Sequence, residues 1–238
     1  MSPPNLPGWN DIPIVRMLEE RFGIRTGIHN DANACALAEW KFGAGVGTQN
    51  MVFLTFGTGL GAGLILDGKL YAGTNDNAGE LGHIRLSEFG PVGYGKCGSF
   101  EGFASGGGIA QLARFKVSEK QQMGESVAWC PPGQLDSISA HTVALAAASG
   151  DPLALEIYRI SATYLGRGLA MVIDLLNPEV IVIGSIYVRN RELMEPFVLQ
   201  EIEREALSHA RRVCSVRPAK LGEQIGDYAA LSVAANLI

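Results

Sequence analysis

The chain of 238 residues has 47% apolar and 18% charged residues, a composition that can bury a sizeable core and excludes a disordered or fibrous protein. The net charge of −5 excludes a broad basic face, so we predict no direct contact between this chain and nucleic acid. Four scattered cysteines, and the lack of an apolar stretch of about 20 residues, favour a soluble, cytoplasmic protein with no membrane partner.

The first elements are a connection, a helix and a strand. MSPPNLPGWND is rich in proline and predicts an extended, turn-rich connection. Apolar residues at helical spacing predict a helix over Ile14–Phe22. Ile24–Ile28 is predicted to be a short strand that delivers Asn30 and Asp31 at its carboxyl end, and Ala32–Phe42 a second helix.

Strands and helices alternate through the rest of the chain, which predicts an α/β fold. Residues 73–98 are rich in glycine and polar side chains and are expected to form ordered loops over a site. The expected strands are Met51–Thr55, Gly63–Leu66, Lys69–Tyr71 and Val180–Ile183, and the expected helices are Gly107–Phe115, Ser139–Ala148, Asp151–Leu176 and Arg191–His209. The first three strands predict a β-hairpin or meander.

Asn30 and Asp31 stand between a predicted strand and a predicted helix. An Asp in this position often caps the helix by accepting backbone N–H bonds, and the residues alone favour that interpretation. The alternative makes Asp31 a general base, with Asn30 orienting the substrate hydroxyl. Ligands bind at the carboxyl ends of strands in open α/β sheets, which supports this alternative.

The segment AGELGH contains Glu80 and His83, three residues apart, and Glu101 follows shortly after. One histidine and two carboxylates are able to ligate a metal, but such a trio more often lies in a solvated loop. The many glycines between these residues favour a binding site, because glycine lets a ligand approach the backbone closely.

The segment VFLTFGTGLGAG runs from an apolar strand into Gly57, Thr58 and Gly59. Backbone N–H groups in such a turn can bind an anion, and the Thr58 hydroxyl adds a donor. The segment lacks the GxxxxGK[ST] pattern and a strand rather than a helix follows it, so a plain hairpin is equally consistent. Gly184, after the strand Val180–Ile183, has the same two interpretations: it borders an adenine or simply ends a strand.

Five motifs in one order resemble the ROK family of sugar kinases and sugar-responsive repressors. They are NDANACALAEW, LTFGTGLGAGLILDGKLYAG, AGELGH, GSFEGFASGGGI and NPEVIVIG, and the resemblance spans about Ser2 to the C-terminus. It implies the actin-like ATPase (ribonuclease H-like) α/β fold. A ROK-type large lobe would cover residues 30–225, with a remnant of the small lobe and connection over 1–29 and a C-terminal helix over 226–238. It also implies that VFLTFGTGLGAG binds phosphate.

The resemblance further implies an ATP-dependent, glucokinase-like hexose kinase. Asp31 matches the catalytic base that takes the proton from the attacking sugar hydroxyl. The residues that match groups holding the other sugar hydroxyls are Asn30, Glu80, His83 and Glu101, and those that match the nucleotide loops are Gly57, Thr58, Gly59 and Gly184. Phosphoryl transfer needs positioning and charge neutralisation, so ATP and a magnesium ion (Mg²⁺) are the implied cofactors. The expected partners are a small-molecule sugar, the nucleotide and a second copy in a homodimer.

Three departures from the family pattern change these expectations. The family often carries a zinc site of one histidine and three cysteines, but Val92, Tyr94 and Ser99 stand at the cysteine positions here. We therefore expect no zinc, with His83 held by packing and hydrogen bonds in the GPVGYGKCGSF loop. The DxGGT phosphate loop of the small lobe does not occur, so we expect a truncated chain that is poorly active as given. GSIY at Gly184 has fewer glycines than the family's adenosine motif.

Two alternatives stay open on the sequence. The chain is also consistent with the sugar-binding part of a ROK-type transcriptional regulator, although no helix-turn-helix is visible in these residues. A catalytically inactive sugar-binding lobe is the other alternative. The sugar itself is not specified by these motifs.

Overall fold

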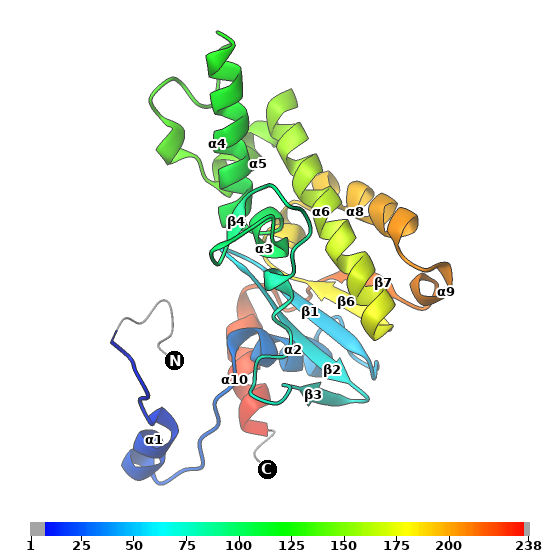
Figure 1. Ribbon diagram of the computed structural model, residues 1–238. Coiled ribbons are helices and arrows are strands. Elements are labelled where there is room, and N and C mark those ends of the chain that lie inside the picture. Colours follow the sequence, from blue (N-terminus) through cyan, green and yellow to red (C-terminus); the bar gives the residue numbers. More distant parts are fainter. Residues whose placement is uncertain (1–7, 236–238) are drawn as a thin grey trace.

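Residues 8–235 are described by the computed structural model, and Pro3, Pro4 and Pro7 of the predicted N-terminal connection lie outside that range. The centre is a five-stranded sheet with the order β3-β2-β1-β6-β7 (Figure 1). Its strands are β1 (Met51–Phe56), β2 (Leu60–Leu66), β3 (Lys69–Tyr71), β6 (Val180–Ile183) and β7 (Ser215–Pro218). β1 to β3 form an antiparallel meander, whereas β1, β6 and β7 run parallel and end at one edge of the sheet.

Helices cover both faces of the sheet (Figure 1). One face carries α2 (Asp31–Phe42) and α10 (Ile225–Ala235), and the other carries α6 (Pro152–Leu176) and α8 (Arg191–Glu205). Further helices in and around the second layer are α3 (Phe100–Phe103), α4 (Gly106–Gln122), α5 (Ala140–Ala148), α7 (Ile186–Arg189) and α9 (Ser208–Arg211). The described part of the chain is thus a layered α/β structure.

Side chains of β1 alternate between the two helical layers, because successive residues of a strand point to opposite faces. Val52, Leu54 and Phe56 belong to the core cluster on the side of α6. Met51 and Phe53 belong to the smaller cluster beneath α2. Burial on both faces explains why this strand reads as a continuous apolar run rather than as an alternating pattern.

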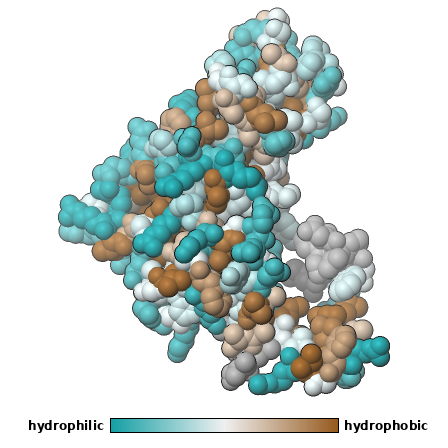
Figure 2. Space-filling view, turned by 180° about the vertical axis from the view of Figure 1, so that it is seen from behind, coloured by the Kyte–Doolittle hydropathy of each residue, from teal (hydrophilic) through white to brown (hydrophobic). Residues whose placement is uncertain are grey.

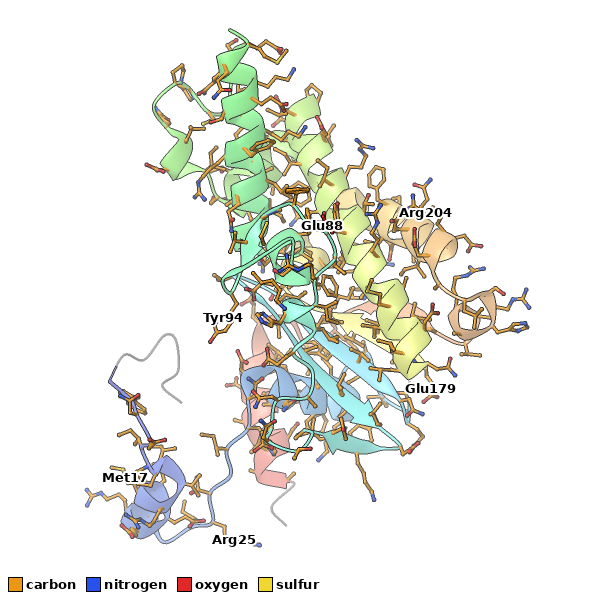
Figure 3. All side chains as sticks on the ribbon, in the orientation of Figure 1. Met17, Arg25, Glu88, Tyr94, Glu179 and Arg204 are labelled. Carbon is orange, nitrogen blue, oxygen red and sulfur yellow. The ribbon has the colours of Figure 1, made fainter. Side chains whose placement is uncertain are left out.

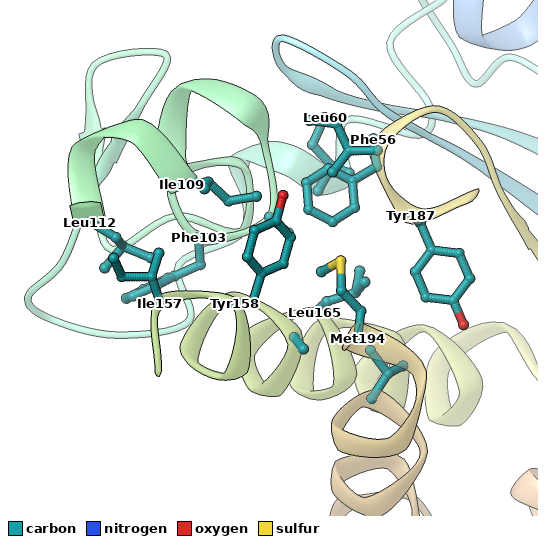
Figure 4. Close-up of a cluster of buried hydrophobic side chains, with 14 of the residues drawn as sticks. Phe56, Leu60, Phe103, Ile109, Leu112, Ile157, Tyr158, Leu165, Tyr187 and Met194 are labelled. Atoms are coloured by element: carbon teal, nitrogen blue, oxygen red, sulfur yellow. The ribbon is translucent and has the colours of Figure 1, made fainter. Parts of the chain in front are cut away.

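The larger core cluster connects the β1–β2 hairpin to the helices that follow it (Figure 4). Phe56 and Leu60 flank the hairpin loop and are buried beside Tyr158 of α6 and Met194 of α8. Each such side chain contributes about 1.5–3 kcal/mol when it leaves water, so the loop is held by a rigid base.

Several elements have the bounds that their sequence predicted. α1 spans Ile14–Phe22 and ends at Gly23, which takes the left-handed conformation typical of a helix C-terminus. α6 begins at Pro152, and the Asp151 side chain caps it by accepting a hydrogen bond from the Ala154 N–H. The predicted buried strand over Val180–Ile183 is β6.

Other predictions about elements are wrong. The strand expected over Ile24–Ile28 does not form, because these residues pair with no strand of the described chain. The helix expected over Arg191–His209 ends at Glu205, and Ser208–Arg211 forms the separate helix α9. β7 was not predicted, since its Ser-Val-Arg-Pro sequence becomes a strand only by pairing with β6 at the edge of the sheet.

The segment before α2 lies apart from the sheet and its helices (Figures 1 and 3). No residue of α1 is buried, and Trp9, Met17, Phe22 and Ile24 are exposed. Figure 2 shows the apolar surface that this segment presents. The amphipathic pattern of α1 therefore has no partner surface among residues 8–235.

Candidate functional site

The loop between β1 and β2 is attached to the start of α4. The Gly57 carbonyl accepts a hydrogen bond from the Gly106 N–H at 2.8 Å, and the Thr58 carbonyl accepts one from the Gly107 N–H at 3.2 Å. The Ser105 hydroxyl caps the same helix by accepting from Gly108 N–H. The first donors of α4 are thus occupied within the protein, and the helix terminus fixes the loop.

The same hydrogen bonds leave part of the loop free to bind a ligand. Gly57 N–H donates to the Gly59 carbonyl at 3.1 Å. By contrast, the N–H groups of Thr58 and Gly59 have no acceptor among the residues that the structure describes, and Thr58 is exposed. Two adjacent backbone donors and a hydroxyl are a set suited to phosphate oxygens. Gly57, which the sequence also assigned to this loop, has its N–H bonded within the loop.

A cavity of about 940 Å³ opens beside this loop. Its walls are the loop, the start of α4, and residues of α5, α6 and α7; the apolar part includes Ala110, Ile138, Ala144, Leu145, Ala148 and Ile186. The charged or titratable residues in its lining are Arg114, His141, Tyr158 and Arg189, with no carboxylate among them. A cavity of this size with an apolar wall and a cationic rim fits a nucleotide-sized anion.

Gly184 lies at a different place from Gly57 and Thr58. It lines a smaller cavity of about 250 Å³ at the carboxyl ends of β1, β6 and β7, together with Cys35 and Ser185. Burial raises the pKa of the Cys35 thiol to about 11, and the nearby Asp31 and Glu39 charges act in the same direction. This thiol is therefore protonated near neutral pH.

The second half of the site begins at α2. Asn30 is the N-cap of this helix: its Oδ1 accepts from the Ala32 N–H at 2.9 Å, and the Asp31 Oδ1 accepts from the same group at 2.8 Å. Asp31 is thus the first helical residue and not the N-cap, but its side chain does accept a backbone N–H bond at the start of the helix. Its carboxylate is exposed and retains a second oxygen for another partner.

Three segments meet at the first residues of β2. A Cβ on Gly61 would lie 3.3 Å from the Cβ of Ala32, so the start of α2 lies against β2 here. The Glu101 Oε2 of α3 accepts a hydrogen bond from Leu60 N–H at 3.0 Å. A Cβ on Gly82 would clash with the Leu60 carbonyl, so the short turn η1 (Leu81–His83) packs at the same place.

Glu80 precedes this turn and His83 is its last residue, and both side chains are exposed. The His83 ring contacts the Tyr94 ring edge-on, with centroids 6.1 Å apart at 75°. The Lys96 Nζ donates a hydrogen bond to the His83 carbonyl at 2.7 Å. Tyr94 and Lys96 come from the hairpin of β4 (Val92–Gly93) and β5 (Lys96–Cys97), and Figure 3 shows Tyr94 at its tip. The sequence had no signal for the Tyr94 contact beyond the loop itself.

Comparisons with known proteins decide the family. The family model of the ROK family matches residues 1–236. The chain belongs to the ROK family. It is 36% identical to a glucokinase of Halalkalibacterium halodurans over 92% of the chain, and it spans 66% of that relative's length. The whole relative is therefore longer than the part that this chain matches.

Solved structures agree with this family assignment. A ROK family glucokinase from Streptomyces griseus in complex with glucose and AMPPNP matches with a TM-score of 0.77 and 32% identity, over 95% of this chain and 73% of that one. A ROK family transcriptional regulator, a homologue of the Escherichia coli MLC protein, matches with a TM-score of 0.80 and 31% identity, over 94% of this chain and 55% of that one. This ROK chain has the actin-like ATPase α/β fold.

The described residues contain neither a cluster of metal-ligating side chains nor a helix that could span a membrane. Within residues 8–235 no group of three or more His, Cys, Asp or Glu side chains is arranged to hold a metal ion. Val92 and Ser99 offer no thiolate beside His83, so these residues do not fit a tetrahedral zinc site. No helix in that range is long and apolar enough to cross a bilayer.

Proposed function

We propose that this ROK chain is the part of an ATP-dependent, glucokinase-like hexose kinase that binds the sugar and the nucleotide. One observation carries the proposal. The loop lines the large cavity with Gly57 and Thr58, carries the free N–H groups of Thr58 and Gly59, and continues directly into Leu60, whose N–H is bonded to Glu101. A phosphate on the loop and a sugar beside Glu101 would thus be neighbours.

Two carboxylates of the proposed sugar site, those of Asp31 and Glu101, each accept a backbone hydrogen bond with one oxygen and keep the other oxygen free. Asp31 holds the Ala32 N–H with Oδ1, which leaves Oδ2 to take the proton from the attacking hydroxyl. Glu101 holds the Leu60 N–H with Oε2, which leaves Oε1 for another sugar hydroxyl. Asn30, Glu80 and His83 would hold the remaining hydroxyls. Such a set rejects a sugar with a misplaced hydroxyl, because a polar group would be left unpaired.

The proposed nucleotide site is the cavity of about 940 Å³. ATP supplies the phosphoryl group when bound, and the apolar wall around Ala144 and Leu145 would take its base. The Thr58 and Gly59 N–H groups would stabilise the charge on the transferring phosphate. No carboxylate lines this cavity, so Mg²⁺ would be held by phosphate oxygens and water.

A regulator is the second candidate function, because a ROK transcriptional regulator matches this chain as closely in structure as the glucokinase does. A regulator would bind the sugar without turnover. We also propose a homodimer, which light scattering of the purified chain would test. A monomer at micromolar concentration would contradict that part of the proposal.

Titration calorimetry tests both candidate functions. We expect the chain to bind glucose and, in a separate titration, AMPPNP with Mg²⁺. A coupled ADP-release assay with glucose then measures turnover. Binding of glucose without any binding of AMPPNP would favour the regulator, and failure to bind either ligand by a folded chain would overturn the kinase proposal.

A further inference from the structure

The Arg189 side chain carries a positive charge and lines the large cavity. Arg189 is the last residue of α7 and lines both the cavity of about 940 Å³ and the smaller one beside Gly184. Within residues 8–235 its guanidinium has no ion-pair or hydrogen-bond partner. By contrast, Arg191 on the next helix pairs with Glu195, and Arg114 in the same cavity donates to the Leu135 and Ile138 carbonyls.

The charges around Arg189 favour an anionic ligand. The large cavity contains Arg114 and His141 besides Arg189 and no carboxylate, and the smaller cavity contains a single one, Glu223. Burial raises the pKa of Tyr158 in the large cavity to about 12, and the Arg189 charge opposes that rise. The guanidinium therefore acts electrostatically on the interior of the large cavity.

The residues just before α7 lie close to the loop between β1 and β2. Ser185 follows β6 with φ +56°, a left-handed conformation that favours glycine. The Ser185 carbonyl accepts a hydrogen bond from the Arg189 N–H at 3.3 Å, and the Ser185 Oγ lies 3.9 Å from where a Cβ on Gly57 would stand. A strained residue held at such a junction is typical of a functional site.

We propose that Arg189 binds the polyphosphate of the nucleotide and thereby positions it against the Thr58–Gly59 loop. A planar guanidinium matches two phosphate oxygens at once. The loop supplies two N–H donors and the first donors of α4 are already occupied, so any formal positive charge that the protein adds to that of Mg²⁺ must come from a side chain. The inference rests on the proposed function, since it names a further binding residue of that same site.

The test compares nucleotide binding by four proteins: the natural chain, Arg189→Gln, Arg189→Lys and the control Arg159→Gln. Arg159 is an exposed residue of α6 outside both cavities, so the control makes the same change in net charge. We expect Arg189→Gln to weaken AMPPNP binding about 10- to 100-fold, Arg189→Lys to weaken it less, and the control to change it less than about twofold. Circular dichroism checks that each variant is folded.

Two further ligands separate this inference from the proposed function. Adenosine lacks the polyphosphate, so its affinity is expected to be unchanged in Arg189→Gln. Tripolyphosphate lacks the base and is expected to lose affinity in that variant. Equal AMPPNP affinity in the natural chain and Arg189→Gln would overturn the role of Arg189 and leave the kinase proposal intact. The natural chain could bind tripolyphosphate but not AMPPNP, with tripolyphosphate binding lost in Arg189→Gln. That result would support the role of Arg189 and overturn the proposed nucleotide site. A natural chain that binds neither would overturn both.

Discussion

The two sides of the β1–β2 loop differ in how their shape is determined. On the proposed nucleotide side, α4, α5, α6 and α7 line a cavity, and side chains around it belong to the main core. On the proposed sugar side, Asp31, Glu80 and His83 are exposed, and no residue of α1, the helix before Asp31, is buried. One side of the loop is thus shaped by packed helices, whereas the other side is open to solvent and depends on individual side chains.

The largest effect is expected from Asp31→Asn. The substitution keeps the shape and the hydrogen bond to Ala32 N–H but removes the proposed base, so kcat should fall about 10²–10⁴-fold. AMPPNP affinity should stay unchanged, since Asp31 lies outside the large cavity. A coupled ADP-release assay and a binding titration measure the two quantities. Asp227→Asn, in the first turn of α10, is the matched control. Full turnover by Asp31→Asn would remove the base from its role.

The second effect concerns the support of α2. Glu39 is fully buried, and its carboxylate accepts hydrogen bonds from the N–H groups of Ala44, Lys220 and Leu221. Glu39→Ala leaves three partly buried backbone donors without their acceptor and should lower the free energy of unfolding by about 3–5 kcal/mol. Glu39→Gln should lose less, because it keeps one acceptor oxygen. Urea denaturation followed by circular dichroism measures the difference, and a loss below about 1 kcal/mol in Glu39→Ala would contradict the role.

A smaller effect is expected from Glu101→Ala. This change removes the acceptor of Leu60 N–H and, in the proposed site, an acceptor for a sugar hydroxyl, so glucose affinity should fall about 10- to 100-fold. Calorimetry with glucose measures the loss. Glu88→Ala is the control, since Glu88 is an exposed carboxylate of the adjacent loop. An equal loss of AMPPNP affinity would break the contrast, because it would mean that Glu101 shapes both sides.

The smallest effect concerns Tyr94. Its ring contacts His83 edge-on, so Tyr94→Ala should let the His83 turn move and should weaken glucose binding about two- to tenfold. Tyr94→Phe keeps the ring and is expected to bind like the natural chain. Calorimetry with glucose compares the two variants. If Tyr94→Phe loses as much affinity as Tyr94→Ala, the hydroxyl rather than the ring contact is responsible.

Elements with local signals were predictable from the sequence alone. Asp151 and Pro152 at the start of α6, and Gly23 after α1, act through hydrogen bonds and backbone angles of a few neighbouring residues. The apolar run of β6 reflects burial on both faces. The order of the five motifs was likewise sufficient to identify the ROK family, which the family model confirmed over residues 1–236.

Features that depend on distant segments were decided only by the tertiary structure. Strand propensity is similar in the two segments Ile24–Ile28 and Ser215–Pro218. Only the second forms a strand, because it lies beside β6 and pairs with it, and propensity alone does not supply such a neighbour. Arg189 and Thr58 line the same cavity because β6 pairs in parallel with β1 and α7 follows directly after Ser185. The free donors of Thr58 and Gly59 were likewise set by packing, since α4 donates to the carbonyls of Gly57 and Thr58 and the N–H groups of Thr58 and Gly59 find no acceptor among the described residues.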